Sequence, residues 1–81
     1  MRLPRDISGK DLIKRLEAFG YFTTRQTGSH VRVTTSLAGE HHITVPLHDQ
    51  LRVGTLNSII SDLAGHFSLD KAEVISKLFD R

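Results

Sequence analysis

The sequence predicts an α+β fold with the element order α-β-β-β-α-α, in which helices cover one face of a three-stranded antiparallel sheet. Apolar residues recur at helical spacing near both ends of the chain, whereas the period falls to two between residues 21 and 45. Short polar and glycine-containing stretches, "TG" and "SLAGE", separate the β-type runs. At 81 residues the chain has room for one domain with one modest core, over residues 1–81.

The first helix is expected over about residues 9–19. Ser8 and Asp11 form a weak capping-box pattern before it, and Gly20 ends it. Its apolar face consists of Leu12, Ile13, Leu16 and Phe19. This helix leads directly into the β-type part of the chain.

Three strands are expected in "YFTTR", "HVRVTT" and "HHITV". Pro46 has no N–H to donate, so it ends the third strand or lies on a sheet edge, and "PLHDQLRVG" forms the loop that follows. A helix resumes near Thr55, with its apolar stripe at Leu56, Ile59, Ile60 and Leu63, and is closed by Gly65. Ser68 is expected to cap a last helix over about residues 68–79.

Strand alternation assigns side chains to the two faces of the sheet. The core face is expected to hold Val31, Val33, Ile43 and Val45, and the open face His30, Arg32, Thr34, His42 and Thr44. If "TG" is a two-residue hairpin turn, Arg25 lies opposite His30 and Gln26 opposite Ser29. A slip of one residue would turn the side chains of the first strand over.

Composition narrows the class of protein. The chain has no cysteine, which excludes disulfides and thiolate metal sites. Its start, "MRLPRDISGK", has no apolar run behind the basic residues, so we expect a soluble, cytoplasmic protein without a membrane segment. Residues 1–35 hold seven Lys/Arg and three Asp/Glu, a balance of +4, whereas residues 36–81 hold four and six, a balance of −2. The basic half contains "RQTGSH" and favours a phosphate-bearing partner.

The stretch "RQTGSH" and the strand after it bring phosphate-binding groups to the open face. Arginine binds phosphate bidentately, and a glycine turn permits close backbone approach. On RNA, a neutral His30 could take the proton of a ribose 2′-hydroxyl, which then attacks the neighbouring phosphorus, while Arg25 and Arg32 stabilise the developing charge. His42, His48 or water could then protonate the leaving oxygen.

Three other interpretations of these residues compete with this one. His30 could be an ordinary half-exposed strand residue. Ser29 is disfavoured as a nucleophile because neighbouring strand residues point to opposite faces, so His30 could not easily activate it. A metal site built from His41, His42, His48 and His66 is disfavoured by their spacing, since no His-x-x-x-His pair exists. His41 is expected at a hairpin end, and His66 at a helix terminus.

Three segments closely resemble the HicA family, the RNA-cleaving toxins of bacterial and archaeal toxin–antitoxin modules. They are "LPRDISGKDLIKRLEAFGY", "RQTGSHVR" and "GEHHITVPLHDQLRVGTLNSIISDL", and together they span residue 3 to about residue 63. The resemblance implies a fold similar to the double-stranded-RNA-binding domain, with the last helix as an extension. It also implies ribosome-independent cleavage of mRNA.

The resemblance places the family's catalytic histidine at His30. Phosphate binding is assigned to Gly28, Ser29, Arg25, Arg32 and Lys10. No cofactor is implied. The implied partners are single-stranded mRNA and an antitoxin of the HicB type, with DNA contacted only indirectly through that antitoxin.

Two departures from the family pattern refine this hypothesis. Many members carry Lys where this chain has Thr27, so Arg25 and Arg32 are expected to hold the phosphate. Double-stranded-RNA-binding domains usually present a lysine-rich start to the helix after the sheet, whereas the equivalent stretch here, "LRVGTL", offers only Arg52, which disfavours duplex recognition by groove shape. A non-catalytic RNA-binding module is the alternative function, and a protein-interaction domain is the third.

Overall fold

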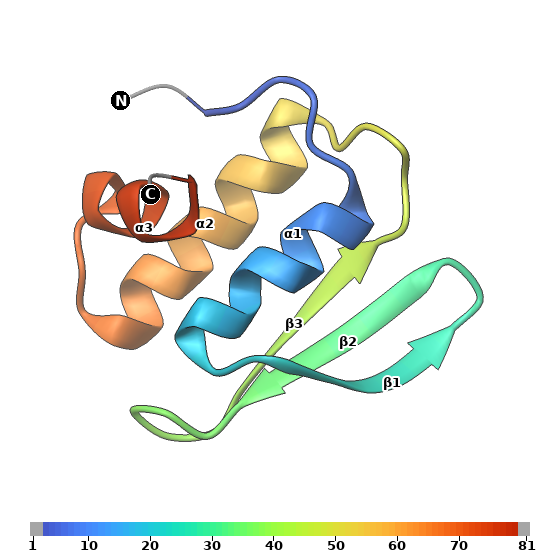
Figure 1. Cartoon of the computed structure of the whole chain (residues 1–81). Coiled ribbons are helices and arrows are strands. Elements are labelled where there is room, and N and C mark those ends of the chain that lie inside the picture. The colour runs from blue at the N-terminus through green and yellow to red at the C-terminus, as the bar shows by residue number, and fades with distance from the viewer. Residues whose placement is uncertain (1–2, 80–81) are drawn as a thin grey trace.

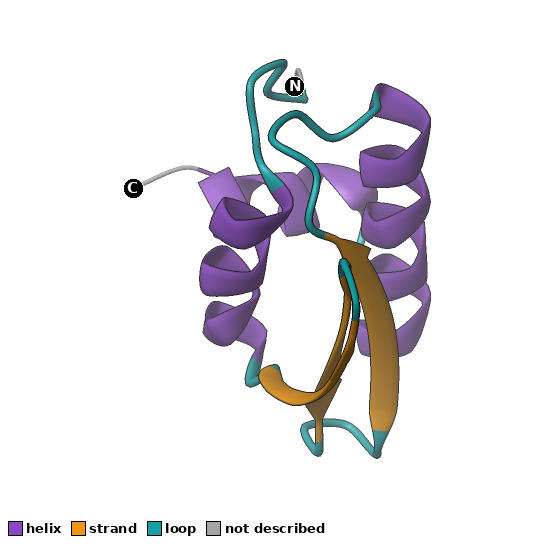
Figure 2. Cartoon of the chain, turned by 90° about the vertical axis from the view of Figure 1, so that its right-hand side faces the viewer, coloured by secondary structure: helices purple, strands orange, loops and turns teal. Residues whose placement is uncertain are grey.

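The computed structural model describes residues 3–79 and has the element order predicted from the sequence. A three-stranded antiparallel sheet in the order β1-β2-β3 packs one face against helices, and the β1–β2 hairpin projects beyond them (Figures 1 and 2). The helices are α1 (Gly9–Leu16), α2 (Val53–Phe67) and α3 (Lys71–Phe79), with a short 3-10 turn η1 (Glu17–Phe19) after α1. The strands are β1 (Phe22–Thr27), β2 (His30–Thr35) and β3 (His41–Pro46).

Of the predicted domain, residues 1–2 and 80–81 lie outside the described range. No helix within residues 3–79 is long and apolar enough to cross a membrane.

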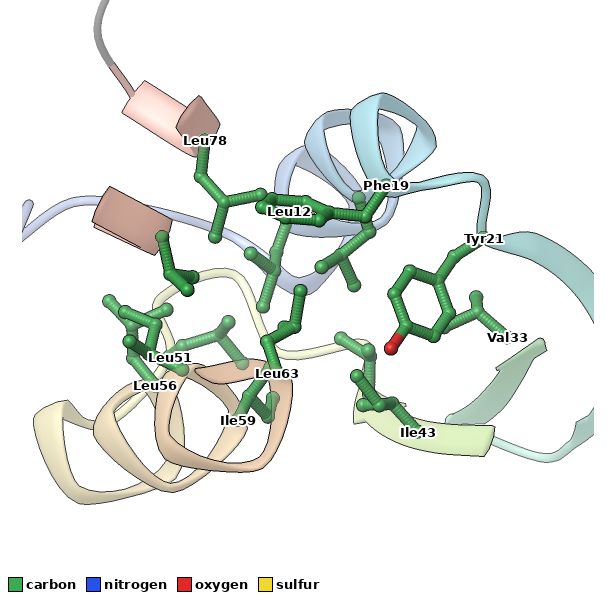
Figure 3. Close-up of a cluster of buried hydrophobic side chains, with 14 of the residues drawn as sticks. Leu12, Phe19, Tyr21, Val33, Ile43, Leu51, Leu56, Ile59, Leu63 and Leu78 are labelled. Atoms are coloured by element: carbon green, nitrogen blue, oxygen red, sulfur yellow. The ribbon is translucent and has the colours of Figure 1, made fainter. Parts of the chain in front are cut away.

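The core lies between the sheet and the three helices (Figure 3). Val31, Val33, Ile43 and Val45 are all buried, which confirms the predicted core face of β2 and β3. The helices contribute Leu12, Leu16, Leu56, Ile59, Ile60, Leu63, Val74, Ile75 and Leu78. Fully burying one such side chain contributes about 1.5–3 kcal/mol. This apolar cluster holds β2 and β3 in place, whereas every residue of β1 is exposed.

The first helix begins as the capping pattern predicts, because the Ser8 hydroxyl accepts a hydrogen bond from the N–H of Asp11 at 3.0 Å. Its C-terminal end tightens into η1, and Gly20 ends the run with φ of 80°. Buried Thr35 then fastens this end to β2, since its hydroxyl donates to the Phe19 carbonyl at 2.8 Å. Pro46 is the last residue of the edge strand β3, as its missing N–H predicts.

The turn between β1 and β2 differs from the prediction. Gly28 and Ser29 are the central residues, so Thr27 pairs with His30 and Arg25 pairs with Arg32. The expected pairs of Arg25 with His30 and Gln26 with Ser29 are therefore wrong. Gly28 has φ of +58° and Ser29 is not among the positive-φ residues, which is the pattern of a type II′ turn. Such a turn needs glycine at its first central position, and "GS" offers it where "TG" does not.

Two predictions about the last helices are also wrong. Gly65 does not end α2, which continues to Phe67 because the Phe67 ring packs on Phe19 at 5.0 Å. A glycine inside a helix costs only about 1 kcal/mol, which this packing offsets. Ser68 closes α2 with φ of 55° instead of capping α3. At the start of α3, the Glu73 carboxylate accepts a hydrogen bond from the Asp70 N–H at 3.2 Å.

The N-terminal segment runs beside the loop from β3 to α2. Gly9 N–H donates to the His48 carbonyl at 2.9 Å, and Leu51 N–H donates to the Ile7 carbonyl at 2.8 Å. Gly9 is buried so closely against β3 that an added Cβ would fall onto the Pro46 carbonyl oxygen. The start of α1 and the end of β3 are thereby fixed to each other.

We expect Gly9→Ala to lower the free energy of unfolding by about 1–3 kcal/mol, because backbone atoms of β3 or α1 must shift to admit the methyl group. Urea unfolding measures the change. Gly65→Ala is the matched control, since its added methyl meets no atom within 4 Å and removes a helical glycine. It should leave the stability unchanged or raise it by up to about 1 kcal/mol. Equal stability of Gly9→Ala and the unmodified chain would contradict the close approach.

Candidate RNA-binding and catalytic site

The open face of the sheet carries a solvent-facing depression of about 320 Å³. It is lined by Arg25, Thr27, His30, Arg32 and Thr44. Strand pairing explains this grouping, because Thr27 lies opposite His30, while Arg32 lies between Arg25 on β1 and Thr44 on β3. The structure thus brings together the histidine and both arginines that the sequence assigned to phosphate chemistry.

Arg25 and Arg32 form a cross-strand pair of like charges. Neither guanidinium forms a hydrogen bond or an ion pair within the described residues 3–79. None of the three strands contains Asp or Glu. Like charges directly opposite one another destabilise a sheet, so an anion bound between these two side chains would relieve their repulsion. Phosphate fits this description.

A β-bulge in β1 determines which side chains share this face. Thr23 pairs with Val33 and Arg25 with Arg32, so Thr24 is the extra residue. Its hydroxyl lies 2.8 Å from that of Thr34 on the neighbouring strand. Because of the bulge, Phe22 and Arg25 lie on the same face, although strict alternation would place residues three apart on opposite faces.

The Gly28–Ser29 turn lies at the end of the depression without lining it. The Gly28 carbonyl accepts a hydrogen bond from the Gln26 side chain at 3.2 Å, and the Ser29 carbonyl accepts one from the Leu47 N–H at 2.6 Å. The second bond joins the hairpin to the end of β3. Both residues are exposed, so the hydroxyl of Ser29 and the surface of the turn are open to a ligand.

The remaining predicted site residues fall into two groups. Lys10 and His48 line a second pocket of about 250 Å³, with Ser8, Leu47 and Asp49, at the end of β3 that pairs with His30. His42 pairs with Thr34, four residues from His30 along β2, which is roughly 13 Å away. The His42 ring lies 2.9 Å from the Glu40 carboxylate and 2.8 Å from the Thr34 hydroxyl. The structure therefore places His48 at the His30 end of the sheet and His42 outside the depression.

Comparison with models of known protein families assigns the chain to a family. The family model described as the HicA toxin of bacterial toxin–antitoxin systems matches residues 9–64, more than half of the chain. This chain belongs to the HicA toxin family. No curated protein and no solved structure gave a significant match. As the toxin of a toxin–antitoxin module, a HicA protein pairs with a HicB antitoxin. Helix α3 lies outside the matched residues of this HicA toxin.

His41 and His66 of the HicA toxin form contacts within the fold, away from the depression. The Tyr21 hydroxyl lies 2.7 Å from Nδ1 of His41, whose Nε2 lies 3.2 Å from the Asp62 carboxylate. His41 stacks on His66 with ring centroids 4.4 Å apart, and Nε2 of His66 faces the carbonyls of Leu37 and Gly39. His41 begins β3 and His66 lies in the last turn of α2, as expected. The two carbonyls that the His66 ring faces belong to the β2–β3 loop and not to the helix end. These contacts tie α2 to the sheet.

No group of three or more His, Asp or Glu side chains within residues 3–79 is arranged to hold a metal ion. The depression instead offers hydroxyl, imidazole and guanidinium groups, which suit a phosphate oxygen.

Sequence reasoning missed Thr27 and Thr44 as lining residues, and it missed the hydrogen bond between Tyr21 and His41. Thr44 was assigned to the open face, and its pairing with Arg32 is what brings it to the depression. Thr27 is the last residue of β1 because Gly28 and Ser29 form the turn. The Tyr21 contact joins residues 20 positions apart, so no local pattern reveals it.

Tyr21 should make the folding stability of the toxin fall at alkaline pH. Burial, reinforced by Asp62, raises the pKa of Tyr21 to about 12 from 10.0. The hydroxyl is neutral in both folded and unfolded chains below about pH 10, so its stabilising effect is fully present there. Between about pH 10 and 12 only the unfolded chain releases the proton, and up to about 2–3 kcal/mol of stability is lost.

Urea unfolding of the toxin and its Tyr21→Phe variant at pH 9 and pH 11.5 isolates this effect, because all other groups titrate in both proteins. Tyr21→Phe should be less stable by about 1 kcal/mol at pH 9, through loss of the bond to His41. The gap should close or reverse at pH 11.5. Parallel losses in both proteins would show that the Tyr21 hydroxyl does not contribute.

Proposed function

We propose that this HicA toxin is an endoribonuclease that cleaves single-stranded mRNA with His30 as general base and without a metal ion. The observation that carries the proposal is that one depression holds His30 beside the guanidinium groups of Arg25 and Arg32, which have no hydrogen-bond or ion-pair partner within residues 3–79. Membership of a toxin family supports it independently.

Binding of the scissile phosphate comes first. Arg25 and Arg32 face each other across β1 and β2, so a phosphate between them accepts hydrogen bonds from both side chains. The hydroxyls of Thr27 and Thr44 lie on the rim of the same depression. The Gly28–Ser29 turn and Lys10 then contact the RNA beyond that phosphate, at the end of the sheet where His30 lies.

The chemical step uses a nucleophile that the RNA supplies. His30 removes the proton from a ribose 2′-hydroxyl, and the resulting oxygen attacks the adjacent phosphorus. The bond from phosphorus to the 5′-oxygen of the next nucleotide breaks as the new bond forms. Arg25 and Arg32 stabilise the charge that grows on the non-bridging oxygens. The products are a 2′,3′-cyclic phosphate and a 5′-hydroxyl end.

The leaving 5′-oxygen needs a proton. Of the two histidines considered from the sequence, His48 lies at the His30 end of the sheet, whereas His42 is held by Glu40 and Thr34 outside the depression. We therefore assign this proton to His48 or to water. A HicB-type antitoxin would inhibit the reaction by covering the depression, and any contact with DNA would be made through the antitoxin.

Cleavage of a labelled single-stranded RNA in the presence of EDTA tests the role of His30. The unmodified chain should cut RNA, leave a cyclic phosphate and spare the all-deoxy strand, which lacks the nucleophile. His30→Ala and His30→Gln should lose about 10²- to 10⁴-fold in rate. His42→Ala, which removes an imidazole from the same face but outside the depression, is the matched control and should retain cleavage.

The same experiment distinguishes the alternatives. Cleavage by His30→Ala at the unmodified rate would exclude His30 as the base, and inhibition by EDTA would exclude a metal-free reaction. If no variant cuts but all bind RNA equally, the chain is a non-catalytic RNA-binding module. If none binds RNA in a salt-dependent way, the open face serves a protein partner.

The contribution of Arg25 and Arg32 to RNA binding should be measurable from the salt dependence of the binding constant. Each cation that neutralises a phosphate of single-stranded RNA contributes about 0.7 to the slope of log K against log salt concentration. Arg25→Ala and Arg32→Ala should each reduce the magnitude of this negative slope by that amount. The measurement uses a 2′-O-methyl RNA that cannot be cleaved. Lys77→Ala, an exposed cation on α3, should leave it unchanged. Unchanged slopes for both arginine variants would place the phosphate elsewhere.

A further inference from the structure

Phe22 is the most exposed of the large apolar side chains in the described chain, with 67% of its surface open to water. No aromatic or cation–π contact involves its ring within residues 3–79. The preceding residue, Tyr21, is only 1% exposed and supplies the aromatic ring that the core uses at this point (Figure 3). Phe22 therefore lies outside the hydrophobic core that residues 3–79 form.

The ring lies on the same face as the depression. Phe22 pairs with Thr34, whose hydroxyl contacts His42 on that face. The bulge at Thr24 brings Arg25 to the same side of β1. Thr34 and Arg32 are two residues apart on β2, so Phe22 is about 7 Å along the strand from the Arg25–Arg32 pair. An aromatic face and a phosphate-binding pair thus lie next to each other along β1 and β2.

This combination is how proteins bind single-stranded nucleic acid, with cations on the backbone and an aromatic ring under a base. The other exposed large apolar residues, Leu37 and Val53, are aliphatic and belong to the β2–β3 loop and to α2. We infer that Phe22 stacks on a nucleobase of the RNA whose phosphate lies between Arg25 and Arg32. The inference rests on the proposed RNA-binding function and adds a substrate-positioning residue to it.

The absence of tryptophan from the sequence makes a direct test feasible. Phe22→Trp introduces the only indole, and stacking on a base should quench its fluorescence. The probe is a single-stranded 2′-O-methyl RNA, with an abasic strand of equal length as its control. Val53→Trp is the matched control variant, because Val53 is similarly exposed but lies at the start of α2.

We expect saturable quenching of Phe22→Trp by the RNA with bases, much weaker quenching by the abasic strand, and none of Val53→Trp. Equal quenching by both strands, or none by either, would overturn the stacking contact.

A substitution series separates stacking from simple apolar contact. Phe22→Ala should weaken binding of the 2′-O-methyl RNA by about 5- to 150-fold. Phe22→Tyr keeps an aromatic face and should bind nearly as well as the unmodified chain. Phe22→Leu keeps apolar area without that face and should resemble Phe22→Ala. Full binding by Phe22→Leu or Phe22→Ala would overturn the inference, as would loss of antitoxin binding by Phe22→Ala with RNA binding intact.

Failure of the stacking contact and failure of the proposed function give different results. If the unmodified chain does not cut RNA but Phe22→Trp shows base-dependent quenching, the nuclease proposal fails and the stacking contact stands. If the chain cuts RNA through His30 and Phe22→Trp is not quenched, the nuclease stands and Phe22 has no role on the RNA.

Discussion

The central strand β2 packs against the helices on one face and meets water on the other. The rest of the molecule depends on which side chains its pleat places on each face. Val31 and Val33 face the helices, and His30 and Arg32 alternate with them toward water. Because β2 pairs on both sides, it also fixes which residues of β1 and β3 join each face. A shift of one residue would bury the imidazole and the guanidinium and expose both valines. The core and the site are thus stabilised by the same register.

The bulge at Thr24 then determines which side chains of β1 lie on each face of the sheet. Without the bulge at Thr24, Phe22 and Arg25 would lie on opposite sides of the hairpin. The change is tolerated because β1 is an edge strand whose residues are all exposed, so no core packing is lost. The hydroxyl of Thr24 further holds the bulge to Thr34. An edge outside the core can therefore be reshaped for a ligand while β2 and β3 keep the fold.

The sequence contains enough information for the element order, the apolar faces and the grouping of His30 with Arg32, because these follow from periodicity. The presence of glycine alone does not determine which two residues make the turn, since "TG" and "GS" both contain one; only the need for glycine at the first central position of a type II′ turn favours "GS". Nor does the sequence locate the bulge, because an extra residue leaves no mark in the polar stretch "TTRQT". The pairing of Arg25 therefore had to come from the structure. The same holds for Tyr21 and His41, whose contact joins separate elements.

Three features that local folding rules disfavour lie together on the open face. They are an Arg–Arg pair without a carboxylate, an aromatic ring in water, and a bulge. Each costs stability or solubility, and none is required by the core on the other side of the sheet. Where local choices conflict with folding, the conflict tends to mark a functional site. Under the proposed function, a strand of RNA would relieve the first two of these conflicts together, because its phosphates would neutralise the arginines and its bases would cover the ring. A small apolar or cationic ligand would relieve one of them at most.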